Sequence, residues 1–305
     1  MYHRSSKIDS LVPVFPVLLR NPCTYILSPN SQFLTGMPSI IFPLEIEEMI
    51  LDILGEDDDG HLALKSCSLV CRAFLSICRK HIFGRIVLNG YRSRNLPRTT
   101  PHALERLLRE TPEIADYIRK LEYTIQDADP ICPSIQTADL INPSIQESLK
   151  QISKLEFLSV RDVGVLDWRW NSIRPALLHL LHLPTLTHFH VTDIKDFIVS
   201  DLISCVNLKY LNIGNHTTVA AENTFPAALP ENSIQLNEFV AGFGTSSSSA
   251  IMKLFTAYRP DGQPIIDFKS LSKITVEIEE PNEGEASQEL FRQCHALTNV
   301  KVSCK

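Results

Sequence analysis

The sequence of 305 residues predicts an α/β protein in which a helical module precedes a row of parallel β-strands. Two observations support this fold class. Between about residues 42 and 88, apolar residues recur at the spacing of amphipathic helices. After residue 89, a short apolar pattern typical of a buried strand recurs, and helix-like segments separate most of its copies. Strands that alternate with helices favour right-handed crossovers and therefore parallel pairing.

The bulk composition argues against several classes of function. The chain is 44% hydrophobic and 21% charged, its net charge is -6, and its isoelectric point is about 5.9. Binding to nucleic acid without sequence preference needs a basic surface, so we expect no nucleic-acid partner. No apolar run reaches the length of a membrane span, so we expect no membrane partner. The eight cysteines form no CxxC pair, and we expect a reduced, intracellular protein of the cytoplasm or nucleus.

Residues 1–38 do not predict a folded element. The stretch 11–19 is apolar, but Pro13 and Pro16 interrupt it, and three further prolines follow. A signal peptide would need an uninterrupted apolar helix and a cleavage site of small residues. We therefore interpret residues 1–38 as a disordered N-terminal arm.

Residues 39–88 predict a module of short helices. Pro43 suits the first turn of a helix, and acidic residues follow it where the helix dipole favours carboxylates. We expect Gly55 to end this first helix. One apolar stripe is formed by Ile46, Ile50, Ile53 and Leu54. Another, between residues 61 and 82, is formed by Cys67, Val70, Cys71, Phe74, Cys78 and Ile82. A module this small buries little core by itself, so its apolar surface should need a partner in this chain or in another protein.

The module also carries a recognisable pattern of residues. It consists of Pro43-Leu44-Glu45-Ile46, Ile50-Leu51, Leu54, Leu64, the run Ser68-Leu69-Val70-Cys71-Arg72, and Phe74. This pattern resembles the F-box, with which members of that family dock on the Skp adaptor of cullin-based ubiquitin ligases. Phe42 and Phe74 depart from it, because leucine and tryptophan are usual at those positions. The resemblance implies an adaptor-binding set of Pro43, Ile46, Ile50, Leu51, Leu54, Leu64, Leu69 and Val70. The alternative is a helical hairpin that only caps a larger domain.

The strand pattern of the remaining chain is an apolar residue, two residues, an apolar residue, one residue and an apolar residue. Its copies are Ile118/Leu121/Tyr123, Leu155/Leu158/Val160, Leu186/Phe189/Val191, Leu208/Leu211/Ile213, Leu236/Phe239/Ala241, Leu271/Ile274/Val276 and Leu297/Val300/Val302. An opening copy is Phe83/Ile86/Leu88. Helix-like segments lie at residues 102–108, 144–152, 175–183, 197–204, 250–258 and 287–294. One such unit cannot bury its own apolar face, so we expect the units to stack.

From about residue 100 to residue 305, this pattern resembles the irregular leucine-rich repeats that often follow an F-box. The resemblance implies a solenoid with parallel strands over residues 89–305. The polar ladder residue of the standard repeat is absent, since Val163, Ile194 and His216 stand at its position. The alternative is an ordinary α/β domain with a parallel sheet, because apolar pairs two residues apart occur in any buried strand.

Residues between the buried positions of a strand point to the opposite face. The first outward column is Lys120, Phe157, His188, Tyr210, Glu238, Lys273 and Asn299. The second is Glu122, Ser159, His190, Asn212, Val240, Thr275 and Lys301. Phe157, His188 and Tyr210 should then be neighbours, and we interpret these three rings as candidate target-binding residues. The alternative is that they only pack on each other or on a loop.

Other stretches do not support sharper functions. One helical face carries Cys67, Cys71, Cys78 and His81, but a straight helix cannot surround a tetrahedral metal, and buried cysteine is the better interpretation. Histidines also gather at His179, His182, His188 and His190, without a cysteine or carboxylate at motif spacing. The glycine- and serine-rich stretch 242–249 lacks the lysine of a phosphate-binding loop. We therefore expect no catalytic residue, metal or cofactor.

The two resemblances together imply a non-catalytic subunit of a Skp-cullin-F-box ubiquitin ligase. The F-box would bind the Skp adaptor, and through it the cullin, while the repeats would bind a target protein. A second hypothesis is a structural interaction scaffold that binds no adaptor. A third is an α/β enzyme, which a pocket with converging titratable groups at the carboxyl ends of the strands would favour.

Overall fold

The computed structural model describes residues 43–57, 60–89, 100–125, 143–162, 167–170, 172–220, 225–226, 228–242, 247–278, 288 and 291–304. Residues 1–44 and residues 45–305 are two separate compact units, and the second of them carries the elements described below. The arm expected at residues 1–38 lies outside the described residues, as do Phe42 and Val163.

The N-terminal elements are three helices, as the apolar spacing predicts. They are α1 (Leu44–Glu56), α2 (Gly60–Cys67) and α3 (Arg72–Gly84). The expectation that Gly55 ends the first helix is wrong, because α1 continues to Glu56. Gly55 serves a different purpose, since a Cβ atom at this position would meet the ring of His81 on α3. The glycine therefore permits the close approach of the two helices.

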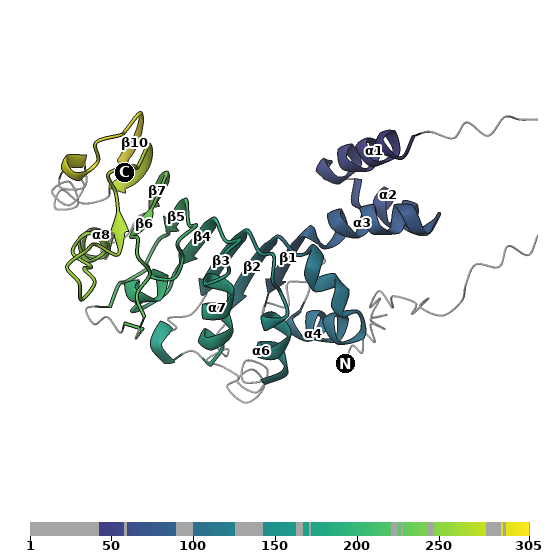
Figure 1. Cartoon of the computed structure of the whole chain (residues 1–305), viewed down its shortest axis with the longest axis horizontal. Coiled ribbons are helices and arrows are strands. Elements are labelled where there is room, and N and C mark those ends of the chain that lie inside the picture. The colour runs from purple at the N-terminus through teal and green to yellow at the C-terminus, as the bar shows by residue number, and fades with distance from the viewer. Residues whose placement is uncertain are drawn as a thin grey trace, which may run out of the picture. The chain divides into compact units, whose positions relative to one another are not determined.

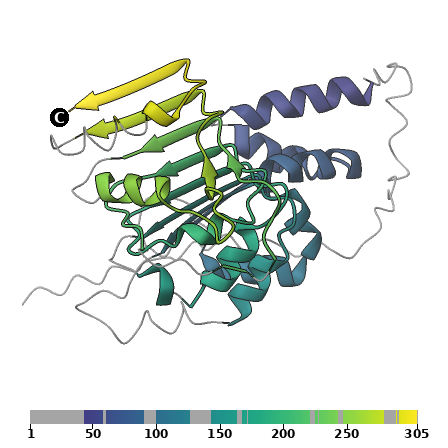
Figure 2. The ribbon, with the colours of Figure 1, turned by 60° about the vertical axis from the view of Figure 1, so that its left-hand side comes forward.

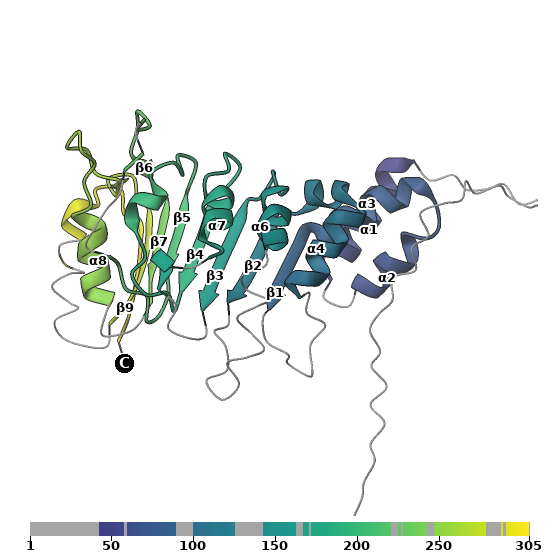
Figure 3. The same cartoon turned by 90° about the horizontal axis from the view of Figure 1, so that it is seen from below.

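The strands form one sheet of eight parallel strands, which confirms the predicted α/β class and the parallel pairing. The strands are β1 (Arg85–Asn89), β2 (Lys120–Ile125), β3 (Phe157–Asp162), β4 (His188–Thr192), β5 (Tyr210–Ile213), β7 (Glu238–Ala241), β9 (Lys273–Ile278) and β10 (Asn299–Cys304). They follow one another in the sheet in their order along the chain (Figure 3). Each new strand is thus added at the same edge, and the order does not reverse as it does in doubly wound sheets.

Helices connect the strands and lie along one face of the sheet (Figure 1). They are α4 (Pro101–Glu110), α6 (Pro143–Lys150), α7 (Arg174–Leu181) and α8 (Ser247–Phe255), with the 3-10 helices η1 (Pro112–Tyr117), η2 (Trp168–Trp170) and η3 (Val199–Leu202). At residues 197–204, where the sequence predicts a helix, the structure has only the short 3-10 helix η3. Phe197 pairs instead with Val219 in an isolated parallel bridge. Of the last expected helix, 287–294, residues 288 and 291–293 are helical within the described part.

A second, two-stranded sheet pairs β6 (Ile234–Gln235) with β8 (Ile266–Asp267) in parallel. The sequence pattern does not indicate it, because strands of two residues carry no detectable alternation. In Figure 2 these short strands lie beside the helical connections, separate from the large sheet.

The core of the sheet consists of the apolar positions of the repeated pattern. From Ile118 to Val276, every such residue is at most 5% exposed, with Ile213 at the upper end. The last copy differs, since Val300 is 50% exposed and Val302 is 45% exposed. This last copy lies on β10, which is at an edge of the sheet and has a neighbouring strand on one side only.

A repeated pair of hydrogen bonds sets the register of the strands. The amides of Glu156 and Phe157 both donate to the carbonyl of Arg119, at 2.8 and 3.0 Å. The amides of Thr187 and His188 donate in the same way to the carbonyl of Glu156, both at 3.0 Å. The pair recurs at each later step of the sheet, through the carbonyls of Thr187, Lys209, Asn237 and Ser272. Equivalent residues of successive strands therefore lie side by side.

Among the described residues, no helix is both long enough and apolar enough to span a membrane.

Candidate functional site

The three N-terminal helices have a small core of their own. Leu51, Leu64 and Cys78 are at most 2% exposed and form its centre. The partly buried side chains around them are Leu54, Cys67, Phe74, Ile77 and Ile82. A polar contact supports the same packing, because a ring nitrogen of His81 lies 2.7 Å from Oδ1 of Asp52. This contact joins α1 to α3 beside Gly55.

The eight predicted adaptor-binding residues divide into exposed and buried groups. Leu51 and Leu64 belong to the core of the helical module, and Leu54 packs against that core. The remaining five, which face solvent, are Pro43, Ile46, Ile50, Leu69 and Val70. Leu69 and Val70 lie in the turn between α2 and α3 and are 79% and 66% exposed. Five of the eight predicted residues therefore lie on the surface of the module. The other three form or support its core.

Further exposed apolar residues extend this surface. Met49 and Ile53 are one turn apart on α1 and are 52% and 62% exposed, and Leu62 on α2 is 74% exposed. Seven of the twelve large apolar side chains exposed among the described residues lie on these three helices or the turn between them. We name these seven the helical apolar surface: Ile46, Met49, Ile50, Ile53, Leu62, Leu69 and Val70. Exposed apolar residues that gather in one small region indicate an interaction site.

The cysteines of the module lie in different environments. Cys78 is fully buried, Cys67 is half-buried and Cys71 is exposed. Burial raises the pKa of the Cys78 thiol, and Cys67 and Cys71 act in the same direction. Within the described part of the chain, no three histidine, cysteine or acidic side chains converge as a metal site would require.

The outward face of the sheet carries the rows of side chains that the sequence predicts. The strand register places Phe157 beside His188, and His188 beside Tyr210. The second predicted column is aligned as well, with Ser159, His190 and Asn212 in one row. The three candidate target-binding residues are therefore neighbours on one surface.

These side chains and His190 form a group of four rings, which we name the ring cluster. The rings of His188 and Tyr210 are stacked with their centroids 5.4 Å apart. His190 lies 4.7 Å from Phe157 and 4.9 Å from Tyr210, again between ring centroids. Phe157, His190 and Tyr210 are half-buried, whereas His188 is exposed. The rings thus support one another and still present an aromatic surface to solvent, as at many protein-binding hot spots.

The ring cluster modifies the acid–base behaviour of two of its members. Burial and the neighbouring His188 lower the pKa of His190, although Glu122 acts in the opposite direction. Burial and the carboxylate of Glu238 raise the pKa of Tyr210. His190 is therefore held in the neutral form near pH 7, which suits an aromatic contact surface.

A polar groove of about 420 Å³ lies at the carboxyl ends of the strands, next to the ring cluster. Its lining comprises Arg161, Thr192, Asp193, Asn212, Gly214, Asn215, His216, Val240, Gly242 and Glu277. Asn212 lines the groove and is the register partner of His190 in the ring cluster, so the groove and the ring cluster share a boundary. Sequence reasoning did not indicate this groove.

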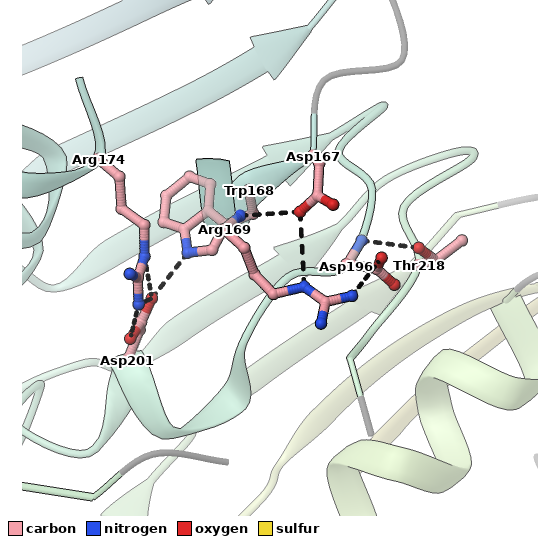
Figure 4. A network of polar contacts seen from close by, with 7 residues as sticks. All are labelled: Asp167, Trp168, Arg169, Arg174, Asp196, Asp201 and Thr218. Atoms are coloured by element: carbon pink, nitrogen blue, oxygen red, sulfur yellow. Dashed lines mark hydrogen bonds and ion pairs between the residues drawn. The ribbon is translucent and has the colours of Figure 1, made fainter. Parts of the chain in front are cut away.

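A partly buried polar network holds the connections between β3 and β5 (Figure 4). Asp201 on η3 accepts a hydrogen bond of 2.7 Å from Nε1 of Trp168 and one of 2.8 Å from Nη2 of Arg174. Beside it, Arg169 donates to Asp196 at 2.7 Å, and the amide of Asp196 donates to the hydroxyl of Thr218 at 2.8 Å. Because the Asp201 carboxylate is 8% exposed and engaged by two side chains, it fixes structure and is not available to a ligand.

Comparison with protein-family models gave no match, and comparison with curated proteins gave none either.

The sequence contains a signal for the groove that the strand pattern alone overlooks. In two copies of the pattern that are neighbours in the sheet, the last apolar residue is followed at once by glycine, at Gly214 and at Gly242. Two glycines at the same place in neighbouring strands remove side chains from one row of the surface. Such a repeated glycine predicts either a tight turn or a hollow.

Proposed function

We propose that this chain is a substrate receptor of a Skp-cullin-F-box ubiquitin ligase in the ubiquitin-conjugation pathway. In this role the α1–α3 module is an F-box that docks on the Skp adaptor, and the cullin is reached through that adaptor. The parallel sheet binds a target protein. The chain performs no chemistry itself, since holding the target near the ubiquitin-charged enzyme raises the effective concentration of the target's lysines.

The observation that carries the proposal is the exposure of the helical apolar surface. If the side of the module with Ile50, Leu54 and Val70 had been sealed inside the chain, it would be closed to a partner. Leu54 does pack against the core of the module, but the other two residues are not sealed. Instead Ile50 is 46% exposed and Val70 is 66% exposed. Removing a large aliphatic side chain from water contributes about 1.5–3 kcal/mol. The seven side chains of this surface, which are 37–79% exposed, would each contribute part of this free energy on docking.

The strand order supports the interpretation of residues 89–305 as leucine-rich-repeat-like. In a solenoid each repeat contacts only its neighbours, so the strands follow the order of the chain. The sheet has this order, and the paired hydrogen bonds recur from one repeat to the next. An ordinary doubly wound α/β domain would place its later strands on the other side of the first.

An enzymatic function is favoured by one observation, the polar groove at the carboxyl ends of the strands. Nucleophilic catalysis would need a nucleophile within hydrogen-bond reach of a base. Thr192 and His216 both line the groove, but among the described residues no hydrogen bond joins their side chains. The charged pair in the groove, Arg161 and Asp193, is already joined at 3.1 Å. This arrangement suits binding better than catalysis.

The proposal is tested by co-purification of the tagged full-length chain from cells. We expect the Skp adaptor and a cullin to be recovered with it. Replacing Leu69 and Val70 by Asp should reduce recovery of both at least about tenfold, because each charge would be buried in the interface. Val206→Asp is the matched control, since Val206 is 44% exposed and lies outside the module. Recovery of other proteins without adaptor or cullin would reject the proposal and favour the structural scaffold.

A further inference from the structure

Two glycines from neighbouring strands line the polar groove beside the ring cluster. The third outward row of the sheet contains Arg161 and Thr192, which are register partners. Gly214 and Gly242 continue this row, since their amides donate to the carbonyls of Val191 and Ile213 at 2.7 and 2.8 Å. The row therefore has a gap over β5 and β7, with longer side chains on both sides.

At both glycines, a larger residue would require neighbouring atoms to shift. A Cβ atom on Gly214 would meet the hydroxyl of Thr192, and one on Gly242 would meet the side-chain oxygen of Asn215. The two glycines thus allow the side chains of Thr192 and Asn215 to pack closely over the strands.

The charges of the groove favour a cation. Among the described residues that line it, Arg161 is the one permanently charged base, and the carboxylate of Asp193 neutralises it at 3.1 Å. Glu277 lines the opposite side and is half-buried. Within the described part of the chain, the Glu277 carboxylate takes part in no ion pair or hydrogen bond. Of the charges on the described lining residues, one negative charge is therefore uncompensated, and the side-chain oxygens of Asn212 and Asn215 lie in the same lining.

We propose that this groove binds a lysine or arginine side chain of an extended target segment, while an aromatic or aliphatic side chain two residues away packs on the ring cluster. This inference rests on the proposed function, because it names the class of target that the sheet binds. His190 and Asn212 lie one row before the groove, which corresponds to about 7 Å along a strand. Side chains two residues apart in an extended peptide lie on one face at the same spacing. A segment of the form apolar-x-basic, or its reverse, therefore fits both parts of the site.

The inference is tested on the full-length chain with short peptides of fixed chemistry. The probes are Phe-Gly-Arg-amide and Arg-Gly-Phe-amide, each carrying a fluorophore on its α-amine for fluorescence anisotropy. Matching probes replace Arg by citrulline, which keeps the shape and removes the charge. We expect one arginine probe to bind at least about tenfold more tightly than its citrulline form. Glu277→Gln should abolish this preference.

Two controls make the test specific. Glu156→Gln removes one carboxylate at the amino ends of the strands, where Glu156 pairs with Arg119 at 3.5 Å, and should leave the arginine preference unchanged. Gly214→Ala should fill the groove and weaken binding, whereas Glu277→Gln changes no packing and remains informative if the glycine variant is unstable. Equal binding of the arginine and citrulline probes overturns the inference. So does a failure of every probe to bind.

Failure of this inference is distinguishable from failure of the proposed function. Glu277→Gln lies on β9, outside the helical module, and should co-purify with the adaptor and the cullin like the unmodified chain. If adaptor docking holds and the arginine preference is absent, only the groove assignment fails. If the preference is present and no adaptor is recovered, the chain is a scaffold that binds basic segments.

Discussion

Asp201 accepts a hydrogen bond of 2.7 Å from the indole nitrogen of Trp168, a residue 33 positions earlier in the chain. Trp168 is fully buried, and its ring packs edge-on against Phe197 with the centroids 5.2 Å apart. The same carboxylate receives Arg174 from the first turn of α7. One acidic side chain thus fixes η2, α7 and η3, the connections that lie between the strands of the ring cluster.

The first prediction concerns Asp201→Asn. The substitution keeps the size of the side chain but removes the charge that faces Arg174, so it should lower the free energy of unfolding by about 2–3 kcal/mol. Urea denaturation measures this loss. Asp116→Asn is the matched control, since Asp116 is 59% exposed and pairs with Lys154 at the surface, and should change stability by less than about 1 kcal/mol. Similar losses in both variants would contradict a special role for Asp201.

The second prediction concerns the helical module. Gly55→Ala introduces a Cβ atom against the ring of His81, which is held by Asp52 at 2.7 Å. Overpacking should cost about 1–3 kcal/mol. At Gly84, which ends α3, a Cβ atom would meet nothing within 4 Å, so Gly84→Ala should be neutral or stabilise by up to about 1 kcal/mol. Urea denaturation of both variants compares them, and a neutral Gly55→Ala would show that α1 and α3 pack more loosely than described.

The strands and their register follow from the sequence because each copy of the pattern contains its own spacing rule. Leu158 and Val160 are two residues apart and both buried, and the same holds in neighbouring copies, so the outward rows follow automatically. In the helical module, no such spacing rule distinguishes buried from exposed apolar residues. Leu51 is buried while its neighbour Ile50 is exposed, although both are apolar. On a helix with apolar residues on most sides, the packing of the other helices decides which residue is buried.

The groove was not predicted because it depends on what is missing from a row. Gly214 and Gly242 are ordinary turn residues when each strand is considered alone. Only the register of the assembled sheet places them next to each other and opposite Glu277. The 3-10 turn at η3 was mistaken for a helix for a related reason. Its apolar residues serve the buried contacts of Phe197 and Val199, which tertiary packing imposes on a short segment.

The third prediction concerns the ring cluster. Tyr210→Ala removes the ring that contacts both His188 and His190. It should weaken capture of target proteins at least about tenfold and leave recovery of the Skp adaptor unchanged, because the module is separate from this surface. Tyr258→Ala provides the control, since Tyr258 is 53% exposed and lies after α8. The measurement is quantitative mass spectrometry of proteins recovered with each variant. Unchanged capture by Tyr210→Ala would reject the ring cluster as a binding surface.

The last prediction is a pH dependence that arises from His190. Burial and His188 lower its pKa in the folded protein below the ordinary value of 6.5. When the pH falls below about 6.5, the unfolded chain therefore binds a proton at this position before the folded chain does. By linkage, stability should decrease as the pH falls through this window and become constant again below the folded pKa.

The variant that tests this dependence is His190→Gln, which cannot take up the proton. Its free energy of unfolding, measured by urea denaturation at several pH values between 7.5 and 5, should fall less steeply with decreasing pH than that of the unmodified chain. His179→Gln, on the exposed side of α7, controls for the loss of a histidine as such. If His190→Gln shows the same slope as the unmodified chain, His190 takes up its proton equally well in the folded and unfolded states. In that case the rings of Phe157 and Tyr210 do not exclude solvent from it.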